Sequence, residues 1–116
     1  MKVILNSRHG EFSLSLNAVR YMAKRGDPGA LEELEDLTNL PEAYQNSLYR
    51  TVARDNPTLL QVFKVLGPEK TSGSFAALEL EEIDESRPWY VEEDRGIERV
   101  VYFGDQHGIP LMRDSK

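Results

Sequence analysis

The chain has 116 residues, which is enough for one domain with a single hydrophobic core. It contains no cysteine, so disulfides and thiolate metal sites are excluded. The formal net charge of −6 disfavours nonspecific contact with nucleic acid or anionic membranes. The apolar run over residues 3–5 is too short for a signal peptide or a membrane span, and we expect a cytoplasmic protein.

A short strand is expected first. Val3, Ile4 and Leu5 form a run rich in β-branched residues, and the run stops at Asn6. Gly10 lies in the connection that follows, and we expect it to adopt a backbone conformation that a Cβ would oppose.

The next segment leads into an amphipathic helix over residues 16–25. Phe12 and Leu14 are expected to point inward, with Ser13 and Ser15 pointing outward. Ser15 also suits the N-cap position, because its side-chain oxygen can accept from the free amides of the first turn. The residues with the spacing of one helical face are Val19, Met22 and Ala23.

Two further helices are expected before the middle of the chain. Asp27 followed by Pro28 predicts the start of a surface helix, because proline fits the first helical position. Its narrow apolar stripe consists of Leu31, Leu34 and Leu37. A third helix is predicted over residues 41–54, where apolar residues recur at steps of four: Tyr44, Leu48 and Val52.

The strongest helix signals bracket residues 57–66. Asp55 or Asn56 can cap the helix, Pro57 suits its first position, and Gly67 followed by Pro68 predicts its end. The apolar residues between these signals are Leu59, Leu60, Val62, Phe63, Val65 and Leu66. A helix that is apolar around most of its circumference is expected to be covered on most sides. We therefore expect it to be the centre of the core, with Phe63 and Leu66 almost fully buried.

From Leu78 the hydrophobic period changes to two, which predicts a strand with one solvated face. Two apolar runs, at residues 89–91 and 97–103, flank a short turn that contains Gly96 and predict a hairpin. The expected fold is therefore α+β: an N-terminal strand, a helical block of three to four helices, and a C-terminal antiparallel β meander or hairpin. We expect one domain over residues 1–104, and a weakly ordered tail over residues 105–116 unless its Ile109-Pro110-Leu111 tripeptide packs onto the domain.

The sequence offers no recognisable catalytic or cofactor site. His9 and His107 are its only histidines, and they do not form a helical metal-binding pair. Ser7 beside His9 lacks the context of a nucleophile elbow. The clustered acids at residues 92–94 lack the ligand spacing of a calcium loop. We therefore predict no catalytic residue, no metal site and no cofactor.

Two binding sites can be suggested. In the first, an acidic hairpin face binds a basic partner surface, because an outward aromatic ring beside acids suits a protein contact. Its residues are Tyr90, Glu92, Glu93 and Glu98. The alternative is a site for a small ligand or nucleotide in the loop after the first strand, formed by Asn6, Arg8, His9 and Arg54. An N-terminal basic cluster that could hold an anionic group consists of Arg8, Arg20, Lys24 and Arg25. For both the acidic hairpin residues and the N-terminal basic cluster, the alternative is a solvated surface without a binding role.

Three stretches together carry a family resemblance. They are Met1-Lys2-Val3-Ile4-Leu5-Asn6 with Gly10, Phe12, Leu14 and Ser15; Arg54-Asp55-Asn56-Pro57-Thr58-Leu59 with Leu66-Gly67; and the Trp89–Val100 run. In this order they resemble a family of small proteins encoded by bacteriophages and prophages. The likeness covers residues 1–26 and 54–103, and Glu11 replaces a glycine usual in that family. Residues 27–53 look like a helical insertion.

The resemblance implies a viral or prophage origin and no particular chemistry. Together with the small size and the acidic composition, it predicts a non-enzymatic protein that binds a host or viral macromolecule. A modulator of host transcription and an inhibitor of a defence system are two examples. The expected partner is a protein, and direct binding of nucleic acid or membrane is not expected. An enzyme with an unrecognised site is the remaining alternative.

Overall fold

The computed structural model describes residues 1–104, so the expected tail over residues 105–116 lies outside the described part. The elements are β1 (Lys2–Asn6), α1 (Leu16–Lys24), α2 (Pro28–Glu35), the 3-10 turns η1 (Leu37–Asn39) and η2 (Glu42–Tyr44), α3 (Pro57–Thr71), β2 (Leu78–Glu82), β3 (Trp89–Asp94) and β4 (Ile97–Tyr102). This mixed α+β composition confirms the predicted fold class. In the described residues, no helix is both long enough and apolar enough to cross a membrane.

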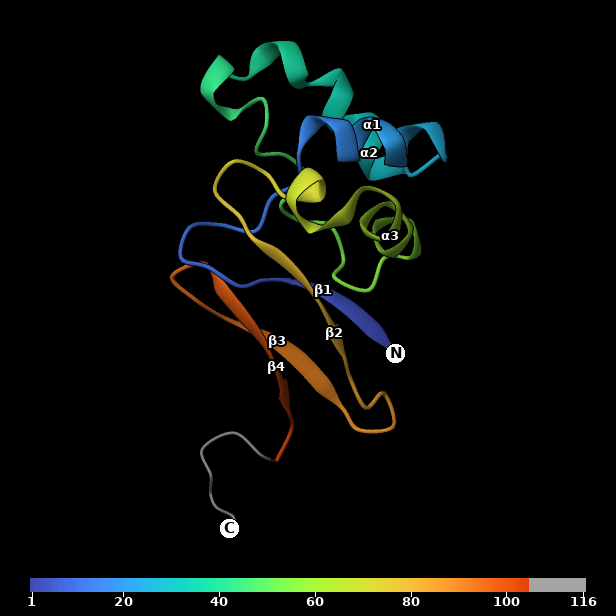
Figure 1. Ribbon diagram of the computed structural model, residues 1–116, viewed down its shortest axis with the longest axis vertical. Coiled ribbons are helices and arrows are strands. Elements are labelled where there is room, and N and C mark those ends of the chain that lie inside the picture. The colour runs from blue at the N-terminus through green and yellow to red at the C-terminus, as the bar shows by residue number, and fades with distance from the viewer. Residues whose placement is uncertain (105–116) are drawn as a thin grey trace.

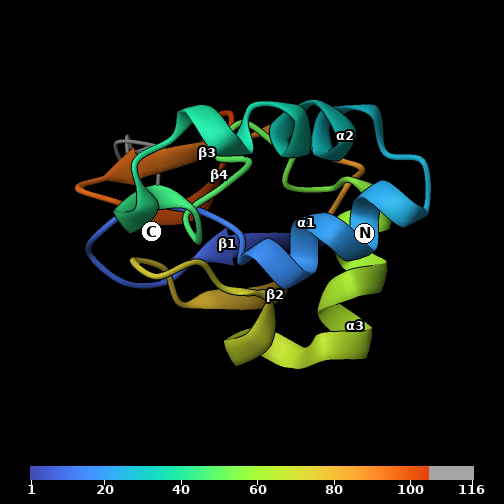
Figure 2. The ribbon, with the colours of Figure 1, turned by 90° about the horizontal axis from the view of Figure 1, so that it is seen from above.

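The strands form two antiparallel pairs, β1 with β2 and β3 with β4. The strand predicted near Leu78 therefore pairs with the start of the chain and not with the C-terminal hairpin. The helices gather at one end of the molecule and the β3–β4 hairpin at the other, with β1 and β2 between them (Figure 1). Viewed from the helical end, α1 lies between α2 and α3 (Figure 2).

The apolar run in β1 is explained by burial on both of its faces. Ile4 belongs to the main core, together with buried residues of α1 and α3. Val3 and Leu5, which alternate with it, belong to a second cluster that also includes Ile83 and is covered by side chains of the β3–β4 hairpin. A strand with two covered faces has no position for a solvated side chain, and its sequence is accordingly continuous in apolar residues.

The segment before α1 is more buried than the sequence suggested. Leu14 forms isolated β-bridges with Leu48 and Ser72, so this extended segment runs between two others. As predicted, Phe12 and Leu14 are buried and Ser15 caps α1, its Oγ accepting from the amide of Ala18 at 3.1 Å. The expectation that Ser13 and Ser15 point outward is wrong, because both serines are buried between the neighbouring segments.

α3 begins as predicted and is covered on one side only. The Asn56 side chain caps it by accepting from the amides of Thr58 and Leu59. Gly67 has non-helical backbone angles (φ 85°, ψ 169°), which confirms the predicted end of the helix there, and a separate short helical segment runs from Pro68 to Thr71 beyond the kink. The fully buried apolar residues of α3 are Leu59 and Val62.

The predicted burial of Phe63 and Leu66 is wrong. Both are partly exposed, and Val65 is 59% exposed. The physical reason is that α3 packs against α1, β1 and β2, and no other element of the described chain makes extensive contact with it. The high apolar content of this helix therefore does not mean that other elements cover it on most sides.

The third predicted helix, over residues 41–54, does not form. The turn η2 and irregular backbone occupy this range, and Tyr49 has a positive φ of 54°, which is incompatible with a helix. The interpretation of residues 27–53 as an insertion stays a prediction. Their side chains nevertheless belong to the main core, to which they contribute Ala30, Leu48 and Val52.

A buried carboxylate joins the starts of α2 and α3. Asp27 caps α2 by accepting from the amide of Ala30 at 3.0 Å. It also accepts from the Tyr49 hydroxyl at 2.7 Å and from Asn56 Nδ2 at 3.0 Å. Burial opposes ionisation of Asp27, but the bonds from Tyr49, Asn56 and the backbone outweigh it and lower the pKa of this carboxyl. The same burial, together with the Asp27 carboxylate, raises the pKa of Tyr49.

Because α3 is buried on one side only, we expect that shortening its side chains lowers the free energy of unfolding by amounts that differ between positions. Leu59→Ala should lower the free energy of unfolding by ~2–5 kcal/mol, because it leaves a cavity beneath a fully buried site. The matched control Val65→Ala should change it by less than about 0.5 kcal/mol, because that side chain is already solvated. Urea unfolding at constant m-value measures both. Equal losses at the two positions would contradict the described packing.

The Asp27 network predicts a pH-dependent stability difference between the wild type and Asp27→Asn, which keeps the capping oxygen and removes the charge. The folded-state pKa is lowered, so the stabilisation is present above the unfolded value of about 3.9 and is lost as pH falls through the folded value. The wild type should therefore exceed the variant in stability near pH 6, and the difference should shrink near pH 3. Tyr49→Phe removes one donor and should reduce this dependence. A constant difference in urea titrations at both pH values would refute the assignment.

Candidate functional site

The β3–β4 hairpin has two chemically different faces. Its loop consists of Arg95 and Gly96, both with positive φ, as in the two-residue turns that match the twist of antiparallel strands. This loop pairs Glu93 with Glu98 and Glu92 with Arg99. Because paired residues share a face and successive residues alternate, Glu93 and Glu98 lie on the face opposite to that of Glu92.

The expectation that Tyr90, Glu92 and Glu98 share one face is therefore wrong. Tyr90 and Glu92 lie on the outer face, whereas Glu98 lies on the inner face with Trp89 and Val91. Glu93 is engaged within its own turn, where its carboxylate accepts from the amide of Gly96 at 2.5 Å.

Glu98 forms a buried ion pair with Arg54, and this pair links the hairpin to the helical layer. Arg54 donates through Nη2 to Oε2 at 2.6 Å and through Nε to Oε1 at 3.0 Å. The exposed fraction is 6% for the Glu98 side chain and 17% for that of Arg54. The guanidinium also lies 3.5 Å from the centre of the Phe12 ring, in a cation–π contact, and donates to the carbonyl of Val52.

Asn6 completes this cluster from the end of β1. Its amide nitrogen Nδ2 donates to the carbonyls of Gly96 at 2.6 Å and Arg8 at 2.8 Å, and its Oδ1 accepts from the amide of Ala77 at 2.8 Å. Its backbone amide donates to Glu98 Oε1 at 3.1 Å. The polar atoms of the Asn6 side chain are thus already bonded inside the protein.

Two glycines allow the loop after β1 to touch the hairpin turn. A Cβ on Gly96 would lie 2.2 Å from the carbonyl oxygen of Gly10, and a Cβ on Gly10 would lie 2.2 Å from that of Phe75. Gly10 has a φ of 138°, which confirms the sequence-based expectation for this position. The loop is therefore held by backbone contacts at which no side chain would fit.

The structure places the residues of the alternative ligand site in different roles. Asn6 and Arg54 belong to the buried cluster. Arg8 and His9 are exposed, and the His9 ring lies 3.3 Å from the carbonyl of Arg95. Ser7 Oγ donates to the carbonyl of Ala77, so it is not bonded to His9. His107 lies outside the described residues, and within them no group of three or more metal-ligating side chains occurs.

The outer face of the hairpin carries an aromatic pair. The rings of Tyr90 and Phe103 lie 5.0 Å apart and are tilted by 50°, and Phe103 is 58% exposed. Val101 pairs with Tyr90 on the same face. Beside the rings, Glu92 forms an exposed ion pair with Arg99. The sequence identified Tyr90 here but missed Phe103, which strand alternation through Val101 could have placed.

Residues 78–104, here called the strand half of the molecule, carry the whole net charge of the protein. Nine acidic and three basic side chains lie between Leu78 and Gly104, a difference equal to the formal net charge of −6. Among these acids, Glu82 and Glu85 pair with the N-terminal ammonium of Met1 at 2.9 and 3.1 Å. Hydrogen bonds to Glu82 and Glu85 raise the pKa of that ammonium. The remaining described residues have equal numbers of acidic and basic side chains, so the protein is electrically asymmetric.

Comparison of the chain with models of protein families, with curated proteins and with solved structures finds no match. The geometry of the chain itself therefore carries the functional argument.

The buried ion pair predicts strong coupling between Arg54 and Glu98. Arg54→Met or Glu98→Leu alone should lower the free energy of unfolding by ~3–5 kcal/mol, because each leaves a buried charge without its partner. The double variant should cost clearly less than the two single changes together. The exposed pair of Glu92 and Arg99 is the control, and its disruption should cost less than about 1 kcal/mol. Additive losses in a urea-based double-mutant cycle at Arg54 and Glu98 would contradict the pairing.

Proposed function

We propose that this protein is a non-enzymatic binding protein whose strand half binds a basic surface on a macromolecular partner. The observation that carries the proposal is the concentration of the whole net negative charge between Leu78 and Gly104, beside the Tyr90–Phe103 ring pair, of which Phe103 is exposed and Tyr90 is half-buried. The binding residues of the proposed surface are Tyr90, Glu92, Val101 and Phe103.

Charge and rings have separate roles in this proposal. The excess of carboxylates creates a negative field that attracts a basic partner and speeds encounter. Glu79 and Glu81 contribute to this field, since both are exposed on β2. The rings and Val101 supply the apolar area whose desolvation gives affinity. The Glu92–Arg99 pair borders this area and is exposed enough to exchange partners on binding.

The proposed partner is a protein and not a nucleic acid. Phosphates would be repelled by the strand half, whereas a surface rich in lysine or arginine would be attracted to it. The resemblance to phage-encoded proteins favours a host or viral protein as this partner, and a modulator or inhibitor role for the complex.

The alternative is a small-ligand or nucleotide site. A hollow of about 250 Å³ touches Arg54, but it is also lined by Glu11, Glu93 and Glu98, whose negative charge opposes binding of a nucleotide. Binding at Asn6 and Arg54 would require breaking the bonds that join β1, the hairpin and the segment before α3. A ligand at this place would have to replace a buried ion pair, which is costly.

Affinity capture from bacterial lysate tests the proposal with three baits: the wild type, Tyr90→Ala combined with Phe103→Ala, and Tyr44→Ala. Tyr44 is 51% exposed and lies in η2, outside the strand half, so it is a matched control for loss of an exposed ring. A specific partner should be retained by the wild type and the control and should be lost with the double variant. Retention of the same partner by all three baits would exclude the outer hairpin face.

The captured partner then allows a test of the electrostatic role. Charge reversal by Glu79→Lys and Glu81→Lys should slow association and weaken its dependence on salt, because screening acts on a smaller charge product. The dissociation rate should change little, because neither residue belongs to the proposed contact area. An unchanged association rate and salt slope would show that the field of the strand half has no role in binding.

A further inference from the structure

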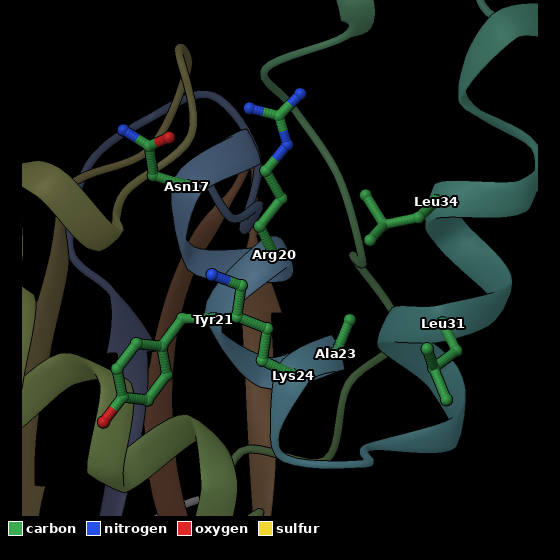
Figure 3. A pocket seen from close by; sticks show the side chains of 7 residues that line it. All are labelled: Asn17, Arg20, Tyr21, Ala23, Lys24, Leu31 and Leu34. Carbon is green, nitrogen blue, oxygen red and sulfur yellow. The ribbon is translucent and has the colours of Figure 1, made fainter.

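A groove between α1 and α2 forms a second surface, in the helical half of the molecule. It has a volume of about 510 Å³ and is lined by residues of both helices. Figure 3 shows Arg20 and Lys24 extending from α1, and Leu34 pointing from α2 toward α1. Ala23 points back toward α2 from the opposite wall.

The floor of the groove is apolar and partly solvated. Leu31 is 46% exposed, and Leu34 is partly buried against the main core. Helical spacing of three places both leucines on the same side of α2. Their exposure in a wide groove leaves apolar area that a bound side chain could remove from water.

The wall of the groove formed by α1 is basic, and its charged groups are free to bind a ligand. α1 contains no acidic residue, and Arg20 and Lys24 are exposed one turn apart. Within residues 1–104, neither side chain has a hydrogen bond or an ion pair. Elsewhere in the same part of the chain, arginines hold carboxylates: Arg50, Arg54, Arg95 and Arg99.

A third cation is fixed beside the groove. Arg25 donates to the Tyr21 hydroxyl at 2.7 Å, and its guanidinium lies 4.7 Å from the centre of the Tyr21 ring. Since Tyr21 itself lines the groove, this contact orients the ring and adds positive charge at the end of α1.

No acidic residue lines the groove within the described part of the chain. Glu35 follows Leu31 by four residues and so lies on the same side of the helix. Glu33 is turned away, since its carboxylate accepts from the amide of Tyr49 at 2.6 Å. The groove is therefore basic along α1, and Glu35 is the acid of α2 that helical spacing places nearest to it.

From this arrangement we infer that the α1–α2 groove binds an acidic, amphipathic helical segment of a partner protein. Its apolar side chains would pack on Leu31 and Leu34, and its carboxylates would face Arg20 and Lys24. Charge complementarity and the apolar floor together select this occupant, because a polyanion without apolar groups would leave the floor exposed. This surface is independent of the hairpin face, so a protein with both could bring an acidic and a basic partner together.

The test uses a labelled synthetic peptide of ~16 residues, with leucine at the i, i+3, i+4 and i+7 positions and glutamate on the remaining faces. Fluorescence anisotropy should show binding with a Kd on the order of 10–100 µM, because the groove is open and buries a small area. A peptide with lysine in place of glutamate, and one with serine in place of leucine, should each bind at least about tenfold more weakly.

Surface variants locate the contact. Arg20→Glu with Lys24→Glu should weaken binding of the acidic peptide at least about tenfold, and Leu31→Ser should weaken it similarly. Glu35→Gln should strengthen it, by about twofold or more, because a repulsive charge is removed. The matched control is Lys64→Glu with Lys70→Glu on α3, whose side chains are also exposed, and it should leave the Kd within about twofold.

Several results would overturn the inference. The inference fails if the acidic peptide does not bind at ~1 mM. It also fails if the charge reversals on α1 and those on α3 weaken peptide binding equally. Preferential binding of a single-stranded oligonucleotide would assign the groove to nucleic acid instead. Self-association in sedimentation that is lost with Arg20→Glu and Lys24→Glu, and is not competed by the peptide, would assign it to a second copy of the chain. Unchanged peptide binding by Tyr90→Ala with Phe103→Ala keeps this result separate from the hairpin proposal.

Discussion

The buried pair of Arg54 and Glu98 is the interaction on which the arrangement of the layers depends. It joins the segment before α3 to the hairpin, while the Asn6 amide shares the same carboxylate from β1. Three segments that are distant in the sequence therefore meet at one group. Because an unpaired charge at this depth is strongly unfavourable, the hairpin cannot shift its register without a large cost. The stacking of Arg54 on Phe12 extends the same constraint to the segment before α1.

The position of this pair also decides which acids remain for binding. Glu98 is withdrawn from the surface, and Glu93 is occupied by its own turn. The outer face is left with aromatic and β-branched side chains and two exposed acids, Glu92 paired with Arg99 and Asp94 paired with Arg95. The negative field of the strand half then comes more from the residues around this face than from the face itself. This arrangement suits a surface on which the surrounding charges speed encounter and the apolar side chains supply affinity.

At the other end of the molecule, the packing of the helices creates a surface of opposite, positive charge. α1 buries its apolar side between α2 and α3, and this leaves Arg20 and Lys24 on the side toward solvent. Since no described residue lining the groove between the two helices is acidic, this groove stays basic. A chain with a net charge of −6 thus presents both signs of charge on separate surfaces.

The sequence by itself determined the local features: the caps at Ser15 and Asp27, a cap at Asp55 or Asn56, the short strand at the start, and the hairpin with its glycine turn. These signals act over a few residues, so no knowledge of the fold is needed to interpret them. Only the tertiary structure decided which side of α3 is covered, that β2 pairs with β1, and that Glu98 meets Arg54. Each of these depends on contacts between segments separated by tens of residues, and neither composition nor periodicity specifies which distant surface a side chain meets.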